Sequence, residues 1–139
     1  MIYIGIDPGT HTGLAVWNGS VLVECTTLPI HKAMKFVTSY RDKCAARQEE
    51  LAVVLEDARQ RTWFGRDRNS TAKLQGAGSI KRDCSIWEDF LTDEGIEFRA
   101  VPPVKGGTKL DADYFRELSG WTGKTSNHAR DAAILVIGR

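Results

Sequence analysis

The chain has little of what marks secreted, membrane or zinc-binding proteins. Its 139 residues include only three cysteines, Cys25, Cys44 and Cys84, whose wide spacing fits neither a zinc ribbon nor a redox motif. No apolar run approaches the roughly 20 residues that span a bilayer. The N-terminus lacks the basic segment of a secretory signal and reaches Asp7 at once. These absences predict a cytoplasmic protein with reduced thiols and no membrane association.

Internal repeats, low-complexity tracts and linkers are also missing. Hydrophobic residues make up 42% of the chain and charged residues 27%, which is ordinary for a soluble globular protein. A chain of this length buries enough surface to fold without disulfides or a structural metal. We therefore expect a single domain that covers residues 1–139.

The chain has no large excess of positive or negative charge, since its net charge is only +1. Its positive charge is nevertheless unevenly distributed along the sequence. Residues 59–82 hold seven basic residues against one acidic residue, so the rest of the chain is net acidic. Such a concentration favours an anionic partner such as nucleic acid, although a solvated basic face would explain it equally. The seven basic residues are Arg59, Arg61, Arg66, Arg68, Lys73, Lys81 and Arg82.

The spacing of apolar residues predicts three strands followed by an alternation of helices and strands. Apolar or alternating runs predict strands at 2–6, 14–17, 21–28, 51–55 and 96–101. Helical spacing predicts helices at 31–48, from 70 or 71 to 95, from Thr108 to Leu118, and from a cap at Ser126 or Asn127 nearly to the end. This order predicts an α/β fold with a mixed five-stranded sheet, three antiparallel strands followed by parallel ones, and helices on both faces.

Acidic residues gather at one edge of the predicted sheet. A right-handed crossover would place strand 51–55 beside strand 2–6, so that Asp7 and Glu56 end neighbouring parallel strands, where open α/β sheets bind ligands. Two adjacent carboxylates repel each other unless a cation lies between them, and oxygen ligands favour Mg²⁺ or Mn²⁺. Asp57 competes with Glu56 for this place, but strand alternation turns the two side chains to opposite faces.

The start of the last predicted helix adds two polar groups. His128 and Asp131 are three residues apart, so they share one face of its first turn. With Asp7 and Glu56 they would form an acidic site that contains one imidazole. Taken singly, each residue has a simpler explanation, as a turn residue, a solvated strand end, or a surface or capping histidine.

Several segments, taken in order, resemble a known family. The segments that carry the resemblance are IGIDPGTHTGLAVW, VVLEDAR, RNSTAKLQGAGSI, KGGTKLDADYF and NHARDAA. They are similar to segments of the Holliday-junction resolvases of the RuvC type, within the RNase H-like superfamily. The resemblance covers most of the chain, and its most specific parts are the opening DPGTHTG and the closing HARDAA.

The resemblance implies a function and a set of site residues. It implies an RNase H-like fold and a metal-dependent endodeoxyribonuclease that acts as a homodimer on four-way DNA junctions, in recombination and repair in a bacterial or phage-infected cell. It also implies two Mg²⁺ ions, for which Mn²⁺ would substitute, and products with a 5′ phosphate. The motif positions of the catalytic and metal-binding residues are Asp7, Glu56, His128 and Asp131, so the resemblance favours Glu56 over Asp57.

The chain also departs from the family. It is shorter than typical cellular members, and the loop after Glu56 is a few residues longer than usual. This loop carries Trp63 and Phe64 where the family places an aromatic residue that probes the junction, so we expect them to stack on or wedge between bases, with buried loop anchors as the alternative. Lys105 and Lys109 flank a Gly-Gly loop, where they would neutralise phosphates or simply lie on the surface.

Three other functions fit parts of the sequence. A nuclease for flaps or other branched DNA would use the same site. A non-catalytic nucleic-acid-binding module would account for the basic segment but would leave the acidic residues without a role. The DPGT segment also resembles the phosphate loop of actin-like and sugar-kinase ATPases, but those proteins need a second, similar domain to enclose ATP. Metal-dependent cleavage of a synthetic junction would distinguish a resolvase from the last two.

Overall fold

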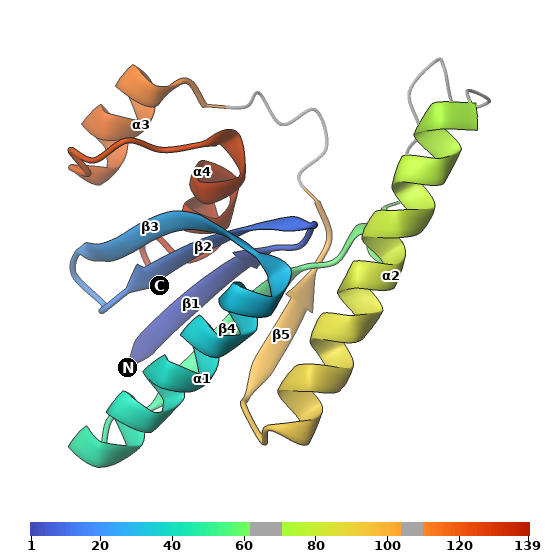
Figure 1. Cartoon of the computed structure of the whole chain (residues 1–139). Helices are drawn as coiled ribbons and strands as arrows, with labels where there is room; N and C mark the ends of the chain where they lie inside the picture. The colour runs from blue at the N-terminus through green and yellow to red at the C-terminus, as the bar shows by residue number, and fades with distance from the viewer. Residues whose placement is uncertain (62–70, 104–109) are drawn as a thin grey trace.

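The computed structural model describes residues 1–61, 71–103 and 110–139, the side chains of 71–74 excepted. In this part of the chain five strands form one mixed sheet in the order β3-β2-β1-β4-β5 (Figure 1). The pairs β1–β2 and β2–β3 are antiparallel, whereas β1–β4 and β4–β5 are parallel, which confirms the predicted mixed sheet. The strands are β1 Ile2–Asp7, β2 His11–Trp17, β3 Leu22–Pro29, β4 Leu51–Glu56 and β5 Phe98–Val101.

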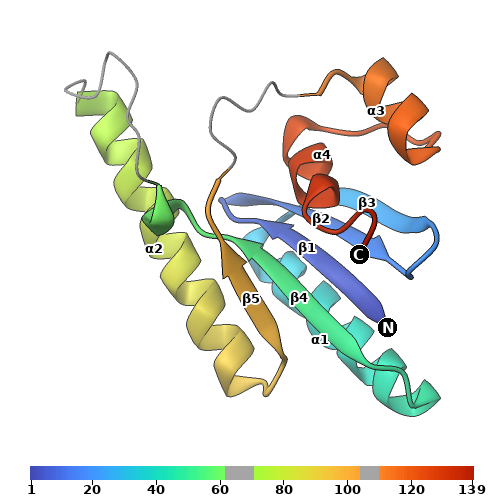
Figure 2. The same ribbon diagram turned by 180° about the vertical axis from the view of Figure 1, so that it is seen from behind.

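Helices cover both faces of the sheet (Figures 1 and 2). The helical segments are α1 Ile30–Arg47, the short 3-10 turn η1 Ala58–Gln60, α2 Thr71–Asp93, α3 Ala112–Ser119 and α4 Asn127–Ile134. On one face, Val37 of α1 and Trp87 and Leu91 of α2 are buried against β1, β2 and β4. On the other face, Phe115 of α3 and Ala132 of α4 are buried against β2, β3 and β4. Strand alternation therefore supplies each layer of helices with its own hydrophobic core.

Two strands, β2 and β5, begin more than one residue away from their predicted starts. Strand β2 begins at His11, three residues before the expected start, because the ladder with β3 continues to the pair His11–Pro29. Strand β5 begins at Phe98 rather than at residue 96, because the N–H of Ile96 donates to the carbonyl oxygen of Leu91 at 2.9 Å and so belongs to the turn that ends α2.

Among the helices, α3 and α4 differ most from their predicted bounds. Helix α3 begins after Asp111, whose carboxylate accepts a hydrogen bond from the N–H of Tyr114 at 2.7 Å; the predicted cap, Thr108, lies outside the described residues. Helix α4 ends at Ile134 instead of running nearly to the end. Residues 135–138 then form hydrogen-bonded turns, and the indole Nε1 of Trp17 donates to the carbonyl oxygen of Arg139 at 3.2 Å.

The first half of α2 extends past the edge of the sheet at which β5 ends (Figures 1 and 2). Residues 75–82 are exposed apart from the half-buried Ala77, and a Cβ atom at Gly76 or Gly78 would meet nothing within 4 Å. The second half is anchored by Trp87 and Leu91, which are fully buried. Within the described ranges, no helix combines the length and the apolar character needed to cross a membrane.

Candidate active site

Two carboxylates end neighbouring strands of the sheet. Asp7 is the last residue of β1 and Glu56 the last residue of β4, and the parallel register pairs Ile6 with Leu55 immediately before them. Adjacent strands lie about 4.8 Å apart, so Asp7 and Glu56 are neighbours at one edge of the sheet. Their predicted placement at the carboxyl ends of adjacent parallel strands is confirmed.

Strand alternation separates Glu56 from Asp57. Leu55 belongs to the core beneath α1 and α2, and Val54 to the core beneath α4, so Glu56 points to the side of α4. Asp57 is only 4% exposed, and its carboxylate accepts a hydrogen bond from the backbone N–H of Arg59 at 3.0 Å as the cap of η1. Asp57 is thus engaged in shaping the turn, which supports the choice of Glu56 as the site residue.

Helix α4 lies very close to the same face of the sheet. A Cβ atom at Gly13 would lie 1.9 Å from the carbonyl oxygen of His128, and one at Gly5 would lie 2.0 Å from that of Ala132. Neither distance is tolerable, so the absence of side chains at these two strand positions gives the helix its room. Because Gly13 pairs with Asp7 in the β1–β2 ladder, this contact brings the first turn of α4 to the strand end that carries Asp7.

The start of α4 is also tied to β3. The Oγ of Ser126 accepts a hydrogen bond from the N–H of Ala129 at 3.0 Å, so of the two predicted caps, Ser126 and Asn127, the structure uses Ser126. Ser126 also hydrogen-bonds the hydroxyl of Thr27. The thiol of Cys25 donates to the carbonyl oxygen of Ala129 at 3.5 Å. Burial raises the pKa of the Cys25 thiol to about 11, against a smaller opposing effect of Arg130, so this cysteine stays a neutral core residue.

His128 completes a contact between α4 and β1. Its Nδ1 lies 2.9 Å from Oδ2 of Asp7. An ionised carboxylate only accepts hydrogen bonds, so beside an ionised Asp7 the imidazole would donate from Nδ1, and the neutral tautomer that does so has a lone pair on Nε2. The His128 side chain is 49% exposed and that of Asp7 only 12%, so the imidazole lies at the surface above a buried carboxylate. Asp131 is half-buried on the next turn of α4.

The donor atoms suit a hard cation that is shared with a substrate. Within residues 1–61, 71–103 and 110–139, no three His, Cys, Asp or Glu side chains form a metal cage by themselves. Mg²⁺ does not require one, because it commonly takes one or two carboxylates and completes its shell with water and substrate phosphates. Asp7 is buried and has a second carboxylate beside it, so such a cation would stabilise its charge. The residues present therefore fit magnesium.

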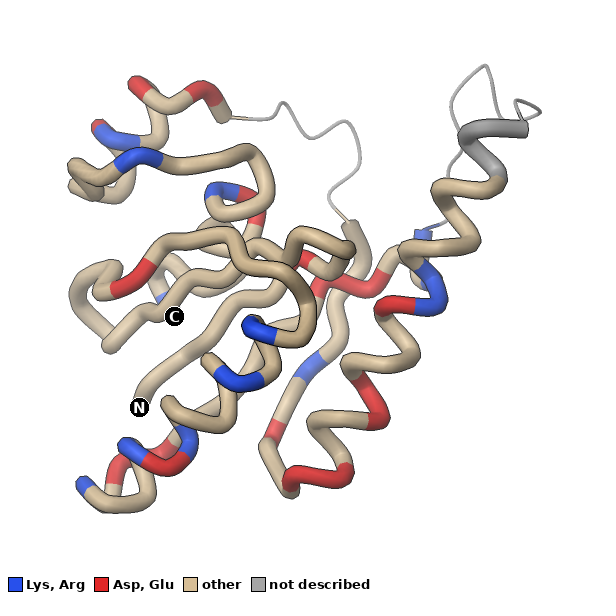
Figure 3. The backbone as a smooth tube through the Cα atoms, viewed as in Figure 1, with Lys and Arg blue, Asp and Glu red and all other residues tan. Residues whose placement is uncertain are grey.

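The described basic residues of the segment 59–82 fall into two groups. Arg59 forms ion pairs with Asp57 and Glu88, so its charge is balanced within the protein, and this argues against its predicted role as a phosphate contact. The second group is exposed and lies at the end of η1 and on α2, where Figure 3 shows blue segments level with the red strand ends. It consists of Arg61, Lys81 and Arg82.

The other predicted DNA contacts are not described by the structure and stay predictions. They are Trp63, Phe64, Arg66, Arg68, Lys105 and Lys109, together with the side chain of Lys73.

Arg130 is a structural residue that the sequence did not suggest. It is 8% exposed, and its Nε donates to the carbonyl oxygen of Leu110 at 2.8 Å. Its Nη1 donates to the carbonyl and hydroxyl oxygens of Thr125 at 2.9 and 2.7 Å, and its Nη2 donates to the side chain of Asn127. Arg130 therefore fixes α4 to the segments that precede α3 and α4. Nothing in the sequence around Arg130 indicates that its side chain is buried. By contrast, a glycine inside a strand does indicate that another backbone segment comes close.

Comparison with known proteins gives a match at the level of structure alone. No family model and no curated protein sequence matches the chain. It aligns with Thermus thermophilus RuvC in complex with a Holliday junction substrate over 97% of its own length and 90% of that chain, with a TM-score of 0.56 and 18% identity. A second structure of Thermus thermophilus RuvC aligns over the same shares, with a TM-score of 0.47 and 19% identity. The first alignment confirms the predicted fold, since the chain has the RNase H-like fold of RuvC.

Proposed function

We propose that the protein is a metal-dependent endodeoxyribonuclease that cleaves branched DNA, with the four-way junction as its main substrate. The observation that carries the proposal is the placement of Asp7 and Glu56 at the ends of neighbouring parallel strands, with His128 Nδ1 2.9 Å from Asp7. Such a site suits phosphodiester hydrolysis, which needs charge neutralisation at phosphate and a positioned water. The fold shared with a RuvC that was solved on a Holliday junction supports the choice of substrate.

In this proposal the acidic edge would bind two Mg²⁺ ions. Asp7 and Glu56 would be the main ligands, and Asp131 and His128 would bind metal or orient its water. Bound magnesium would supply neutralisation of the phosphate charge and a lowered pKa of the attacking water. Mn²⁺ would substitute, because the ligands are oxygens and one imidazole.

The protein's own groups orient the reaction. The contact between His128 Nδ1 and Asp7 fixes the plane of the ring, and in the tautomer that donates from Nδ1 the lone pair of Nε2 would accept a hydrogen bond from water. A water oxygen attacks the phosphorus atom, the bond to the 3′ oxygen breaks, and that oxygen takes up a proton. The products are a 5′ phosphate and a 3′ hydroxyl.

Binding of the DNA backbone falls to exposed cations. These cations lie at the edge of the sheet that carries the acidic site: Arg61 directly follows η1, and Lys81 and Arg82 lie on α2. Each cation that neutralises a phosphate releases counterions, so binding will weaken steeply with salt. The protein would act as a homodimer, because a four-way junction has two strands to cut and a two-fold assembly supplies two sites. Light scattering of the free protein and of its junction complex tests this stoichiometry.

The decisive experiment compares substrates and metals. Four-way, flap, bubble and linear duplex DNA are each incubated with the protein in Mg²⁺, Mn²⁺ or EDTA. We expect metal-dependent cuts in the four-way junction and little cleavage of the linear duplex. Preferred cutting of flaps would identify the other branched-DNA nuclease, and binding without cleavage in any metal would identify a non-catalytic module.

Asp7→Asn separates binding from cleavage. Loss of the charge should reduce the cleavage rate by at least roughly 10²–10³-fold, the size of effect seen when one group that stabilises a transition state is removed. Junction affinity should stay the same or rise, because negative charge is removed near DNA. Asp89→Asn, the same substitution at an exposed position of α2, is the matched control and should cleave normally. Cleavage by Asp7→Asn within a few-fold of wild type would refute the active-site assignment.

A further inference from the structure

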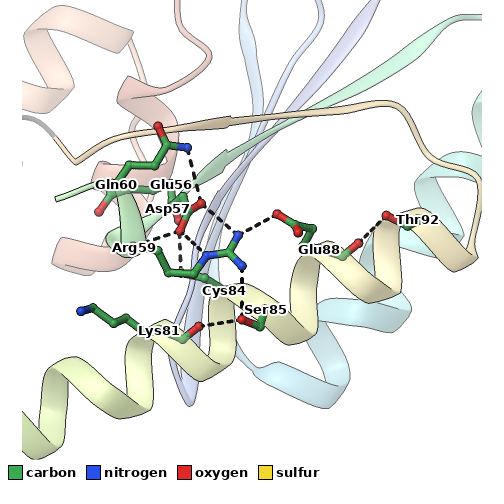
Figure 4. Close-up of polar contacts among 9 residues, drawn as sticks. All are labelled: Glu56, Asp57, Arg59, Gln60, Lys81, Cys84, Ser85, Glu88 and Thr92. Atoms are coloured by element: carbon green, nitrogen blue, oxygen red, sulfur yellow. Dashed lines mark hydrogen bonds and ion pairs between the residues drawn. The ribbon is translucent and has the colours of Figure 1, made fainter.

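The turn that follows Glu56 is held by a single buried carboxylate. Asp57, 4% exposed, accepts two side-chain hydrogen bonds from Arg59, from Nε to Oδ1 at 2.8 Å and from Nη2 to Oδ2 at 2.9 Å (Figure 4). Its Oδ1 also accepts the backbone N–H of Arg59 at 3.0 Å, and Gln60 donates to Oδ2 at 3.4 Å. These contacts close the turn on itself, and the paired hydrogen bonds fix the plane of the guanidinium.

The same guanidinium connects the turn to α2. Nη2 of Arg59 donates to Oε2 of Glu88 at 2.6 Å, and Nη1 donates to Oγ of Ser85 at 3.2 Å (Figure 4). Ser85 and Glu88 lie three residues apart and therefore on one face of the helix. One cation thus lies between two carboxylates from different elements. The hydrogen bonds that Arg59 donates, above all those from its side chain, lower the pKa of Asp57. The hydrogen bonds to Asp57 and Glu88 in turn raise the pKa of Arg59.

The backbone around Glu56 is held from both sides. Its carbonyl oxygen accepts the thiol of Cys84 on α2 at 3.6 Å, and the N–H of Asp57 donates to the carbonyl oxygen of Val101 on β5 at 2.7 Å. Strand alternation turns the Glu56 carboxylate toward α4 while Asp57 reaches toward α2. A shift of α2 relative to the turn would therefore be transmitted to the residue that carries a candidate metal ligand.

We propose that Arg59 is a positioning residue that fixes the candidate active-site edge at Glu56 in register with α2, the helix that carries Lys81 and Arg82. This role rests on the proposed function, since it concerns where the basic part of α2 holds the DNA relative to the acidic edge. It also replaces the expectation that Arg59 binds phosphate directly. Arg59 would affect the rate of DNA cleavage through its contacts with Asp57, Ser85 and Glu88, without touching the substrate.

The chain offers a matched control for this arginine. Arg41 of α1 also connects two elements, because its Nη1 donates to the carboxylate and to the carbonyl oxygen of Glu94, near the far end of α2. Arg41→Ala therefore removes an interhelical ion pair at a distance from the acidic edge. Arg59→Ala, Arg59→Lys and Glu88→Gln are compared with it and with the wild type, at a temperature at which circular dichroism shows all of them folded.

The first measurement is independent of activity. Cys84 is buried against the carbonyl oxygen of Glu56, so loss of the Arg59 bridge should expose its thiol. Labelling of the native protein with N-ethylmaleimide, followed by peptide mass spectrometry, gives the rate at Cys84 with Cys25 as internal reference. We expect at least a fivefold faster reaction of Cys84 in Arg59→Ala, a smaller rise in Glu88→Gln, and no change in Arg41→Ala. An unchanged Cys84 rate in Arg59→Ala would overturn the proposal whether or not the protein is a nuclease.

The second measurement separates positioning from DNA contact. A displacement of about 1 Å at a catalytic site commonly lowers the rate about 10²-fold, so Arg59→Ala should lose roughly 10–100-fold in single-turnover cleavage, with junction affinity within twofold of wild type. Arg59→Lys should recover part of the rate, because lysine retains the charge but not the paired hydrogen bonds. A loss of affinity with a shallower salt dependence would make Arg59 a phosphate contact and overturn the proposal. If the wild type cleaves no branched DNA, the proposed function fails, and the Cys84 rates alone decide the positioning role.

Discussion

Replacing Gly13 by alanine should move α4 away from Asp7. The added Cβ would lie 1.9 Å from the carbonyl oxygen of His128, whereas real contacts of this kind essentially never fall below 3.0 Å. Because the neighbouring atoms are backbone, the helix and the strand must separate by about 1 Å, which a close-packed interior resists. The hydrogen bond between His128 Nδ1 and Asp7 Oδ2, now 2.9 Å long, would not survive a shift of that size.

The expected losses can be stated for stability and for activity. Overpacking typically costs about 1–3 kcal/mol, and a lost hydrogen bond about 1 kcal/mol more, so Gly13→Ala should lower the free energy of unfolding by about 2–4 kcal/mol. The displacement of His128 should lower single-turnover cleavage of a four-way junction by about 10²-fold. Urea unfolding followed by circular dichroism measures the first quantity, and the second is measured below the unfolding transition.

Two other glycines calibrate the test. Gly5→Ala should destabilise to a similar extent, since its Cβ would lie 2.0 Å from the carbonyl oxygen of Ala132. Gly76→Ala should instead stabilise by roughly 0.5–1 kcal/mol, because alanine favours a helix and the added Cβ would have open space around it. If Gly13→Ala unfolds at the same urea concentration as wild type and cleaves at the same rate, α4 does not pack against β2 at Gly13. This contact then does not hold His128 beside Asp7.

Four further predictions address other parts of the molecule. His128→Asp should keep substantial cleavage, because a carboxylate also binds a hard cation, whereas His128→Ala should lose most of it; equal rates in folded variants would remove His128 from the site. Replacing Lys81 and Arg82 by alanine should flatten the slope of log K against log salt by about 2 units in anisotropy titrations, and an unchanged slope would assign both to a solvated face. The side-chain hydrogen bond from Arg59 lowers the pKa of Asp57 in the folded protein. The Asp57 carboxylate therefore stabilises the fold above its unfolded pKa of about 3.9, and this contribution is lost as pH falls through the lower folded pKa. The difference in the free energy of unfolding between wild type and Asp57→Asn should be constant from about pH 7 to 5 and should close below about pH 4. The thiol of Cys25, whose pKa burial raises to about 11, should react with iodoacetamide at pH 8 far more slowly in the native protein than in urea.

Much of the sheet and of its acidic edge could be predicted because local patterns determine them. The apolar run before Asp7 and the β-branched run before Glu56 define two buried strands, and the handedness of crossovers makes them parallel neighbours. Ser126 was recognisable as a cap because capping depends on residues within one turn.

The arrangement around Arg59 was not predictable in the same way. Its partners Ser85 and Glu88 lie 26 and 29 residues further along the chain, and no local pattern shows that they face the turn after β4. In the sequence Arg59 is one more cation in a basic segment, which is why a DNA contact was expected. The cap of α3 shows a milder form of the problem, since both Thr108 and Asp111 satisfy the capping preference and the structure uses Asp111.

The hydrogen bond between His128 and Asp7 joins residues that are 121 positions apart in the sequence. A ribosome adds about 5–20 residues per second, so on the order of ten seconds separate the synthesis of the two. Late in that interval the growing chain already carries both strand-end carboxylates and the basic segment, but it lacks the imidazole and the helix that presents it. Under the proposed function, a chain interrupted before α4 would carry the cations that attract DNA but not the groups of α4 that complete the site, and competence for cleavage would arrive only with the last helix.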